Sequence, residues 1–234
     1  MGDAYSAIGA LADPVRRRLY AYVAASETGV GREEAARGVG VAPHTARFHL
    51  DKLVEEGLLA VDQRRLTGRS GPGAGRPAKV YRRSAAEVAV SLPDREYDLV
   101  GHVLAAAVER SLAGAPLDEA LTEEARAAGR RDGSAYEGAG DELDRTAGAL
   151  AGRGFEPRAV GDDLELRNCP FDVLAQSHPA LVCGVNHDYV AGLLDGLACA
   201  GVHAALDPGP ERCCVRVVGT AREAAATAGA QPPA

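Results

Sequence analysis

The sequence lacks several features that would assign it to common classes of protein. No run approaches the roughly 18 consecutive apolar residues of a membrane-spanning helix. The segment Met1–Leu11 lacks both the basic start and the long apolar core of a secretory signal. There is no glycine-rich phosphate loop, no Gly-x-Ser-x-Gly and no paired carboxylate motif. We therefore expect a cytoplasmic protein that does not associate with membranes and is not an enzyme.

Cysteine is absent from the first 168 residues. The five cysteines of the chain are Cys169, Cys183, Cys199, Cys213 and Cys214. Because disulfides are rare in the cytosol, these residues are better explained as thiols or metal ligands. The gaps between the first four are 13, 15 and 13 residues. These gaps are far wider than the roughly two to four residues that separate paired zinc-finger ligands, so spacing alone identifies no zinc finger or ribbon.

Positive charge is also scarce, because the 234 residues carry a formal net charge of −7. The charge is unevenly distributed along the chain. Residues 1–84 hold 14 Lys and Arg against 9 Asp and Glu, a net charge of +5, whereas residues 85–234 hold 12 against 24, a net charge of −12. A basic N-terminal part joined to an acidic remainder is typical of a DNA-binding domain with a separate regulatory domain.

The stretch 32–83 has the pattern of a winged helix-turn-helix. Residues 33–38 predict a short helix, residues 38–42 a tight turn, and Pro43–Glu56 a second helix that starts with proline at a favourable position. Apolar residues of the second helix recur at spacings of three and four, which places them on one face. The other face is expected to meet DNA, and it carries His44, Thr45, Arg47, Phe48 and Asp51.

Two predicted strands favour this motif over an ordinary amphipathic helix with a solvated polar face. Gly57 ends the helix, and a strand begins at Leu58. A loop over Gly68–Pro77 follows, and Ala78–Arg82 returns as the second strand. Basic residues of this hairpin are placed to contact phosphates or the minor groove, and they are Arg69, Arg76 and Lys79. We therefore predict binding to double-stranded DNA.

Further helices are expected on both sides of the motif. Tyr5–Leu11 and Pro14–Ala25 should pack beneath the second helix, with Asp13 as a cap. After a linker at Ser84–Leu92, the helix Tyr97–Leu112 is apolar at every fourth residue. A core helix is one interpretation. A homodimer helix is favoured, because we expect the operator to contain two half-sites.

The whole chain predicts an α+β fold. Helices are expected at Leu117–Arg131 and Asp141–Arg153, with a glycine-rich loop over Asp132–Gly140 between them. A hairpin over Phe155–Asn168, a helix over His187–Ala200 and two strands complete the chain. The predicted parts are a winged helix-turn-helix domain (1–84), a helical linker and dimerisation region (85–153), a small α+β cysteine-containing sensor domain (154–220) and a disordered tail (221–234).

Three runs of residues resemble those of ArsR-type winged-helix repressors. They are Ala12–Leu19, His44–Leu53 and Gly75–Tyr81. Together with the cysteine-rich end, they resemble more closely the SufR-like regulators, which carry a cysteine-rich sensor domain. This resemblance implies a transcriptional regulator, with a repressor favoured, whose operator binding is modulated by an iron–sulfur cluster. Such a cluster would report iron–sulfur status or redox and nitrosative stress.

The resemblance also implies the ligands of the cluster, for which 4Fe–4S is favoured over 2Fe–2S. Cys169 and Cys183 are the first two expected ligands. One of Cys213 and Cys214 is the third, because adjacent residues in a strand point to opposite faces. The sequence expectation is that these cysteines lie at the ends of secondary-structure elements, where a cluster can be held at the domain surface.

The fourth ligand and the chemistry of the site stay open at this point. The fourth ligand is His187, His178, Asp207 or a small molecule. Cys199 lies among small apolar residues and is expected to be an inert buried thiol. One alternative function is a winged-helix regulator with a structural zinc site that responds to a small-molecule or metal effector. A cysteine enzyme is a third, disfavoured by the missing motifs.

Overall fold

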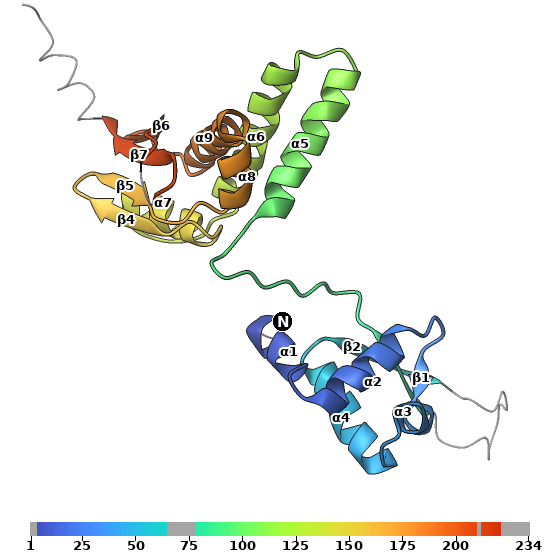
Figure 1. Cartoon of the computed structure of the whole chain (residues 1–234). Coiled ribbons are helices and arrows are strands. Elements are labelled where there is room, and N and C mark those ends of the chain that lie inside the picture. The colour runs from blue at the N-terminus through green and yellow to red at the C-terminus, as the bar shows by residue number, and fades with distance from the viewer. Residues whose placement is uncertain (1–3, 65–77, 210–211, 221–234) are drawn as a thin grey trace, which may run out of the picture. The chain divides into compact units, whose positions relative to one another are not determined.

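The computed structural model of the chain describes residues 4–64, 78–209 and 212–220 (Figure 1). The chain divides into two compact units, residues 1–90 and residues 91–234. Within the described ranges, no helix combines the length and the apolar character needed to cross a membrane. The predicted loop residues Arg69 and Arg76 and the predicted tail 221–234 lie outside the described residues.

The first unit is a group of helices beside a small antiparallel sheet of order β1-β3-β2. A helix-turn-helix is formed by α3 and α4, and the ladder of β2 and β3 comes after it. The described elements of this unit are α1 (Ala4–Ala10), α2 (Pro14–Ala24), β1 (Val30–Gly31), α3 (Arg32–Val39), α4 (Pro43–Glu55), β2 (Leu59–Arg64) and β3 (Ala78–Arg83).

Local signals set the ends of these helices. The carboxylate of Asp13 caps α2 by accepting hydrogen bonds from the backbone nitrogens of Val15, at 2.8 Å, and Arg16, at 3.0 Å. Gly40 has a φ of 73°, which lets the chain leave α3 and turn toward α4. The apolar face of α4 is buried, with Ala46, Leu50 and Leu53 fully covered. The helix α4 therefore ends one residue before the predicted Glu56, and its apolar face is oriented as predicted.

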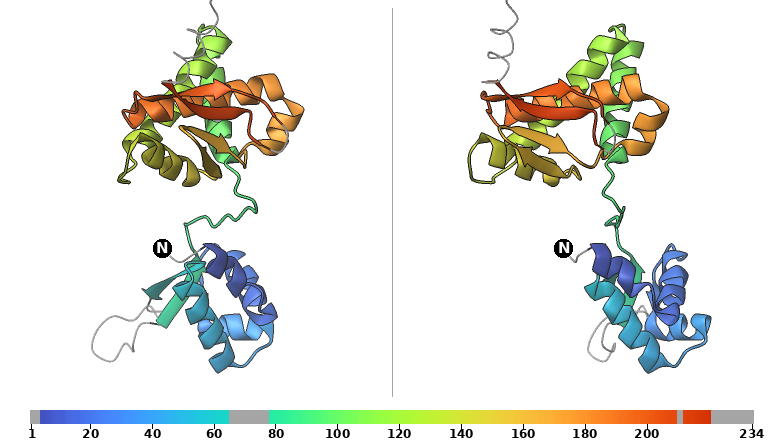
Figure 2. Two further views of the ribbon diagram at one scale, coloured as in Figure 1. Left: turned by 90° about the vertical axis from the view of Figure 1, so that its left-hand side faces the viewer. Right: turned by 60° about the vertical axis from the view of Figure 1, so that its left-hand side comes forward.

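The second unit combines helices with an antiparallel sheet of order β4-β5-β7-β6. The helix α9 contacts both β6 and α6, and α5 packs against α6, so α9 lies between the sheet and the other two helices (Figures 1 and 2). The described elements are α5 (Tyr97–Leu112), α6 (Leu117–Ser134), α7 (Glu142–Ala151), β4 (Pro157–Val160), β5 (Asp163–Leu166), α8 (Asp172–Ser177), α9 (Pro179–Gly196), β6 (Val202–Leu206) and β7 (Val215–Gly219).

A single core runs through the second unit. It includes Val100 of α5, Leu150 of α7, Leu166 of β5 and Leu193 of α9. The predicted helical region 85–153 and the predicted sensor domain 154–220 therefore share one hydrophobic core. The helix α5 is a core helix along part of its length, because Val100 is buried, whereas its last residue, Leu112, is 84% exposed.

The helices α6 and α9 cross in direct backbone contact. A Cβ on Gly129 of α6 would overlap the carbonyl oxygen of Tyr189, and a Cβ on Gly192 of α9 would overlap that of Arg126. Gly133 and its neighbours repeat this arrangement one turn further along. Only glycine allows so close an approach, because it has no side chain. The helix α6 is therefore packed tightly against α9.

Two predicted elements differ from the structure. The predicted loop Asp132–Gly140 is helical at its start, because α6 continues to Ser134. Asp132 there accepts a hydrogen bond from the hydroxyl of Tyr189, at 2.7 Å, and pairs with Arg153. The helix α9 begins at Pro179, well before the predicted His187. Cys183 therefore lies inside a helix and not at the end of an element, which corrects the expectation for this residue.

Candidate nucleic-acid interface and cysteine site

The helix α4 presents an exposed face formed by residues that the sequence assigns to DNA. His44, Arg47 and Phe48 are exposed, and Thr45 is half-buried. Phe48 is 68% exposed, an unusual position for a large aromatic side chain on a small domain. Arginine can form paired hydrogen bonds to guanine, and an aromatic ring can contact the thymine methyl group. This face therefore carries side chains suited to reading bases in the major groove.

Asp51 on the same helix is held by the sheet. Its Oδ1 accepts hydrogen bonds from Nζ of Lys79, at 2.8 Å, and from the hydroxyl of Tyr81, at 2.9 Å. Its Oδ2 lies 3.7 Å from Nε of Arg47. The ammonium of Lys79, predicted to contact DNA phosphates, is thus paired within the protein, although half of its side chain is exposed. Sequence reasoning placed Asp51 on the DNA face and missed its link to β3.

The electrostatics of this link favour a charged Asp51. Burial on its own would raise the pKa of Asp51, but the hydrogen bonds from Lys79 and Tyr81 outweigh burial and hold the pKa below its ordinary value. The pKa of Tyr81 is strongly raised, first by burial and then by its bond to the carboxylate. The hydroxyl of Tyr81 therefore stays protonated and donates to Asp51 throughout the physiological pH range.

A hollow lies beside this link and adds to the charged surface. It is bordered by the start of α3, by α4 and by the β2–β3 ladder. Arg37, Arg47 and Lys79 line it together with Glu33 and Glu34. With Arg32, four cationic side chains thus line a hollow beside α4, an arrangement suited to the phosphate contacts that position a protein on DNA.

Three cysteines meet in the second unit. Cys169 follows β5, whereas Cys213 and Cys214 precede β7. A hydrogen bond between Cys169 and Cys213, followed by burial, strongly raises the pKa of Cys169. The same bond lowers the pKa of Cys213, but its bond to Cys214 and burial outweigh this effect and raise that pKa to about 11. The contact connects residues that are far apart in sequence.

The helix α9 supplies a further contact to these thiols. Asn186 is fully buried, and its Nδ2 lies 3.1 Å from Sγ of Cys213. Cys183 precedes Asn186 by three residues on the same helix, so the two side chains share one face. Cys183 is half-buried. Asn186 thus contacts one of the three thiols, that of Cys213, and Cys183 lies one turn before Asn186 on α9.

The candidates for a fourth ligand, unlike the three thiols, are paired with other side chains or exposed. Nδ1 of His187 lies 3.3 Å from a carboxylate oxygen of Asp188, and His178 is exposed at the start of α9. Asp207 is paired with Arg212, at 3.0 Å, and Arg216, at 2.8 Å. The hydrogen bonds from Arg216 and Arg212 lower the pKa of Asp207. Asp207 is thus engaged in its own ion pairs.

Cys199 occupies a different part of the second unit. It is buried after α9, and its Sγ lies 3.6 Å from Nη2 of Arg145 and 3.8 Å from Oγ1 of Thr146. Both partners belong to α7. Contacts from an arginine and a threonine are consistent with a packed structural thiol, and they separate Cys199 from the cysteine site formed by Cys169, Cys213 and Cys214.

The number and placement of the sulfur donors determine whether the cysteine site suits a zinc ion or an iron–sulfur cluster. Among the residues that the structure describes, no group of three or more His, Cys, Asp and Glu side chains is placed to hold a metal ion. A zinc ion needs ligands that converge on one point, at about 2.3 Å for sulfur. A cluster distributes its thiolates over several irons, and soft thiolate donors suit such clusters. The thiols of Cys169, Cys213 and Cys214 are the donor type that such clusters use, but as described they do not form a group placed to hold a metal.

Comparison with protein families supports an assignment for the N-terminal unit. Residues 11–62 match the family described as a helix-turn-helix domain. The search of curated proteins and the search of solved structures gave no match. The matched residues contain α2, α3 and α4, the helices that carry and support the exposed face. The chain therefore has a helix-turn-helix domain in its N-terminal unit, and this domain indicates DNA binding and a role in transcription regulation.

Proposed function

We propose that the protein is a winged-helix transcriptional repressor, not an enzyme, that reads its operator with the exposed face of α4. The observation that carries this proposal is the overlap of the family match with a helix that exposes His44, Arg47 and Phe48. The ladder of β2 and β3 supports a wing, whose loop would supply Arg69 and Arg76 to the phosphate backbone.

We propose a homodimer that binds two operator half-sites. Apolar side chains are exposed where α5 ends and α6 begins, at Val108, Leu112 and Leu117. Exposed apolar side chains that lie close together commonly mark a protein interface. A symmetric dimer would present two α4 helices to successive major grooves, which are roughly 34 to 36 Å apart. The first half of α5 is occupied by the core, so the proposed interface uses its second half.

We further propose that the cysteine site holds an iron–sulfur cluster, with 4Fe–4S favoured. Cys169, Cys183 and one of Cys213 and Cys214 would be its ligands, and His187 or His178 would complete the set. The meeting of Cys169 with Cys213 and Cys214 supports this proposal. The bond from Asn186 would tune the ligand sulfur, because hydrogen bonds to sulfur influence cluster potentials. Once bound, the cluster would supply an oxidant-sensitive and nitric-oxide-sensitive centre.

Anaerobic purification with iron, sulfide and zinc analysis tests the cysteine site. We expect brown protein that contains iron and sulfide. Cys169→Ser and Cys183→Ser should lose both elements, whereas the control Cys199→Ser should keep them. Zinc without sulfide would support the alternative of a structural zinc site in a regulator that responds to another effector. If Cys199→Ser lost as much iron and sulfide as the other two variants, the assignment of Cys169 and Cys183 as ligands in preference to Cys199 would be wrong.

DNA binding is tested separately by selecting operator sequences from a random pool with the wild-type protein. The expected product is a pair of related half-sites about one helical turn apart. A selected pool without sequence preference would contradict a base-reading role for α4. This experiment does not depend on the metal content of the protein.

A further inference from the structure

Arg47 and Asp51 lie one turn apart on α4 and face each other. Nε of Arg47 is 3.7 Å from Oδ2 of Asp51, and the side chain of Arg47 is 66% exposed. The guanidinium group is a rigid, planar fork of five N–H donors. Because Nε faces the carboxylate, Nη1 and Nη2 at the outer end of the side chain are left to bind a ligand.

The carboxylate of Asp51 is fixed from the other side by β3. Its Oδ1 accepts hydrogen bonds from Nζ of Lys79, at 2.8 Å, and from the hydroxyl of Tyr81, at 2.9 Å. Tyr81 is itself buried, with 1% of its surface exposed. Two donors on Oδ1 keep Oδ2 turned toward Arg47. A strand of the ladder therefore determines where this negative charge lies on α4.

The two Nη groups match the major-groove edge of one base. Guanine presents two acceptors there, O6 and N7, which a pair of arginine donors can reach together. Adenine presents one acceptor beside a donor, cytosine presents a donor, and thymine presents one acceptor beside a methyl group. A fork that carries donors alone therefore makes two hydrogen bonds with guanine and not with the other three bases.

A DNA phosphate is the other common ligand of an exposed arginine. Although burial on its own would raise the pKa of Asp51, the hydrogen bonds from Lys79 and Tyr81 hold that pKa below its ordinary value, so the carboxylate is charged at neutral pH. A negative charge beside Arg47 reduces the attraction of its guanidinium for a charged phosphate. Guanine is neutral and is less affected. The pair of Arg47 and Asp51 therefore favours a base over a phosphate.

We propose that Arg47 binds a guanine of the operator through Nη1 and Nη2, and that Asp51 is the positioning residue that directs the guanidinium to this base. The inference rests on the proposed reading of the operator by α4, and it adds the identity of one base. It also gives Lys79 and Tyr81 of β3 a role in sequence specificity, because these two residues fix Asp51.

The test uses the full-length protein and the operator duplex that it selects from a random pool. Each guanine of this duplex is replaced in turn by 7-deazaguanine, which lacks the N7 acceptor but still pairs with cytosine. Hypoxanthine, which keeps both major-groove acceptors, is the control base. Affinities are measured by titration for the wild type, Arg47→Ala and Asp51→Asn. The matched control protein is Glu55→Gln, which removes a carboxylate of α4 that pairs with Lys52 instead of Arg47.

We expect at least one guanine at which 7-deazaguanine weakens wild-type binding by about 5-fold or more, because a good base contact contributes a factor of roughly 5 to 150. Hypoxanthine at that position should have little effect. Arg47→Ala should abolish the 7-deazaguanine penalty at that guanine, and Asp51→Asn should reduce it. Penalties at the other positions should stay unchanged in both variants, a pattern that general damage to the fold does not produce. Glu55→Gln should keep every penalty.

A second variant covers the case in which Asp51→Asn does not fold, as judged by circular dichroism. Tyr81→Phe removes one of the two bonds that fix Asp51 and keeps the aromatic ring. It should reduce the penalty at the same guanine. An unchanged penalty in this variant would then overturn the positioning role.

Three negative results are distinguishable. If Arg47→Ala keeps every guanine penalty, Arg47 does not bind guanine, and the proposed reading of the operator by other residues of α4 stands. If the penalty is lost in Arg47→Ala but kept in full in Asp51→Asn, the positioning role of Asp51 is overturned. If the wild-type protein shows no sequence preference, the proposed function of α4 is refuted and the inference falls with it.

Discussion

Replacing Tyr81 by Phe removes one hydroxyl from the link between α4 and β3. Tyr81 is 1% exposed, and its ring volume is kept by Phe, so the change creates no sizeable cavity. The lost bond is to a charged acceptor, a class that contributes about 1.5 to 3 kcal/mol. Because Asp51 keeps its bond to Lys79, we expect the lower end, a loss of about 1.5 kcal/mol in the free energy of unfolding.

Thermal unfolding and operator titration measure the two consequences of this change. For a unit of this size, each kcal/mol corresponds to roughly 4 to 8 °C in Tm. We also expect weaker operator binding, because the recognition face would no longer be held in one orientation against the ladder. Tyr22→Phe, at a more exposed tyrosine of α2, is the control. Unchanged stability would refute the energetic reasoning, and lost stability with normal operator affinity would limit the link to a structural role.

The same link predicts how stability depends on pH. The pKa of Asp51 in the folded protein lies below its unfolded value of about 4. Its contribution to stability is therefore fully present above the unfolded pKa and is lost as pH falls through the lower folded pKa. Asp51→Asn should remove this part of the acid dependence, which unfolding measured at several acidic pH values detects. An identical acid profile in the variant would contradict the assignment.

Three further predictions concern other parts of the molecule. Arg47→Ala should cost about 1 to 3 kcal/mol of discrimination between the operator and base-substituted competitors, and equal preference in both proteins would exclude Arg47 from base reading. Leu112→Glu should convert the dimer to a monomer in sedimentation experiments, and an intact dimer would place the interface elsewhere. Gly129→Ala should lower the free energy of unfolding by more than about 3 kcal/mol, because its Cβ meets backbone, whereas Gly101→Ala on the open side of α5 should not.

Sequence reasoning worked where the signals are local. The helix α4 was predicted to within one residue at its end, because Pro43 and Gly57 mark its limits and its apolar residues keep a helical spacing. The hairpin of β4 and β5 was predicted for a similar reason, since Gly161 takes a positive φ in its turn. Each of these features depends on residues within one element.

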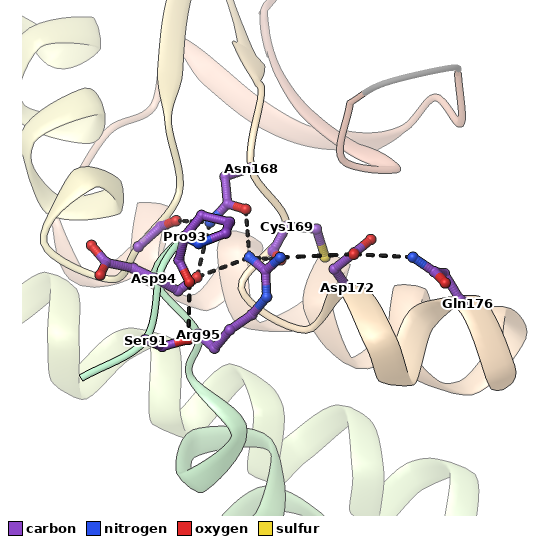
Figure 3. A network of polar contacts seen from close by, with 9 residues as sticks. Ser91, Pro93, Asp94, Arg95, Asn168, Cys169, Asp172 and Gln176 are labelled. Carbon is purple, nitrogen blue, oxygen red and sulfur yellow. Dashed lines mark hydrogen bonds and ion pairs between the residues drawn. The ribbon is translucent and has the colours of Figure 1, made fainter. Parts of the chain in front are cut away.

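Sequence reasoning failed where the role of a residue depends on its contacts with another helix or strand. Gly133 suggested a loop, but it is glycine because α9 passes against it. The extended start of α9 was missed, and Cys183 was therefore misplaced. The bond between Asp51 and Tyr81 spans 30 residues of sequence and leaves no local signal. The same holds for Asn168 and Arg95, whose polar side chains are joined by a hydrogen bond of 2.6 Å and gave no indication that they would meet (Figure 3).

The glycine crossing of α6 and α9 has a mechanical consequence. Side chains between two helices normally act as a deformable layer, because they can change rotamer and absorb small displacements. Here backbone lies on backbone at Gly129 and Gly192, so that layer is missing. The two helices should therefore move together as one rigid body. A displacement of α9 near Cys183 would then displace α6 along its whole length.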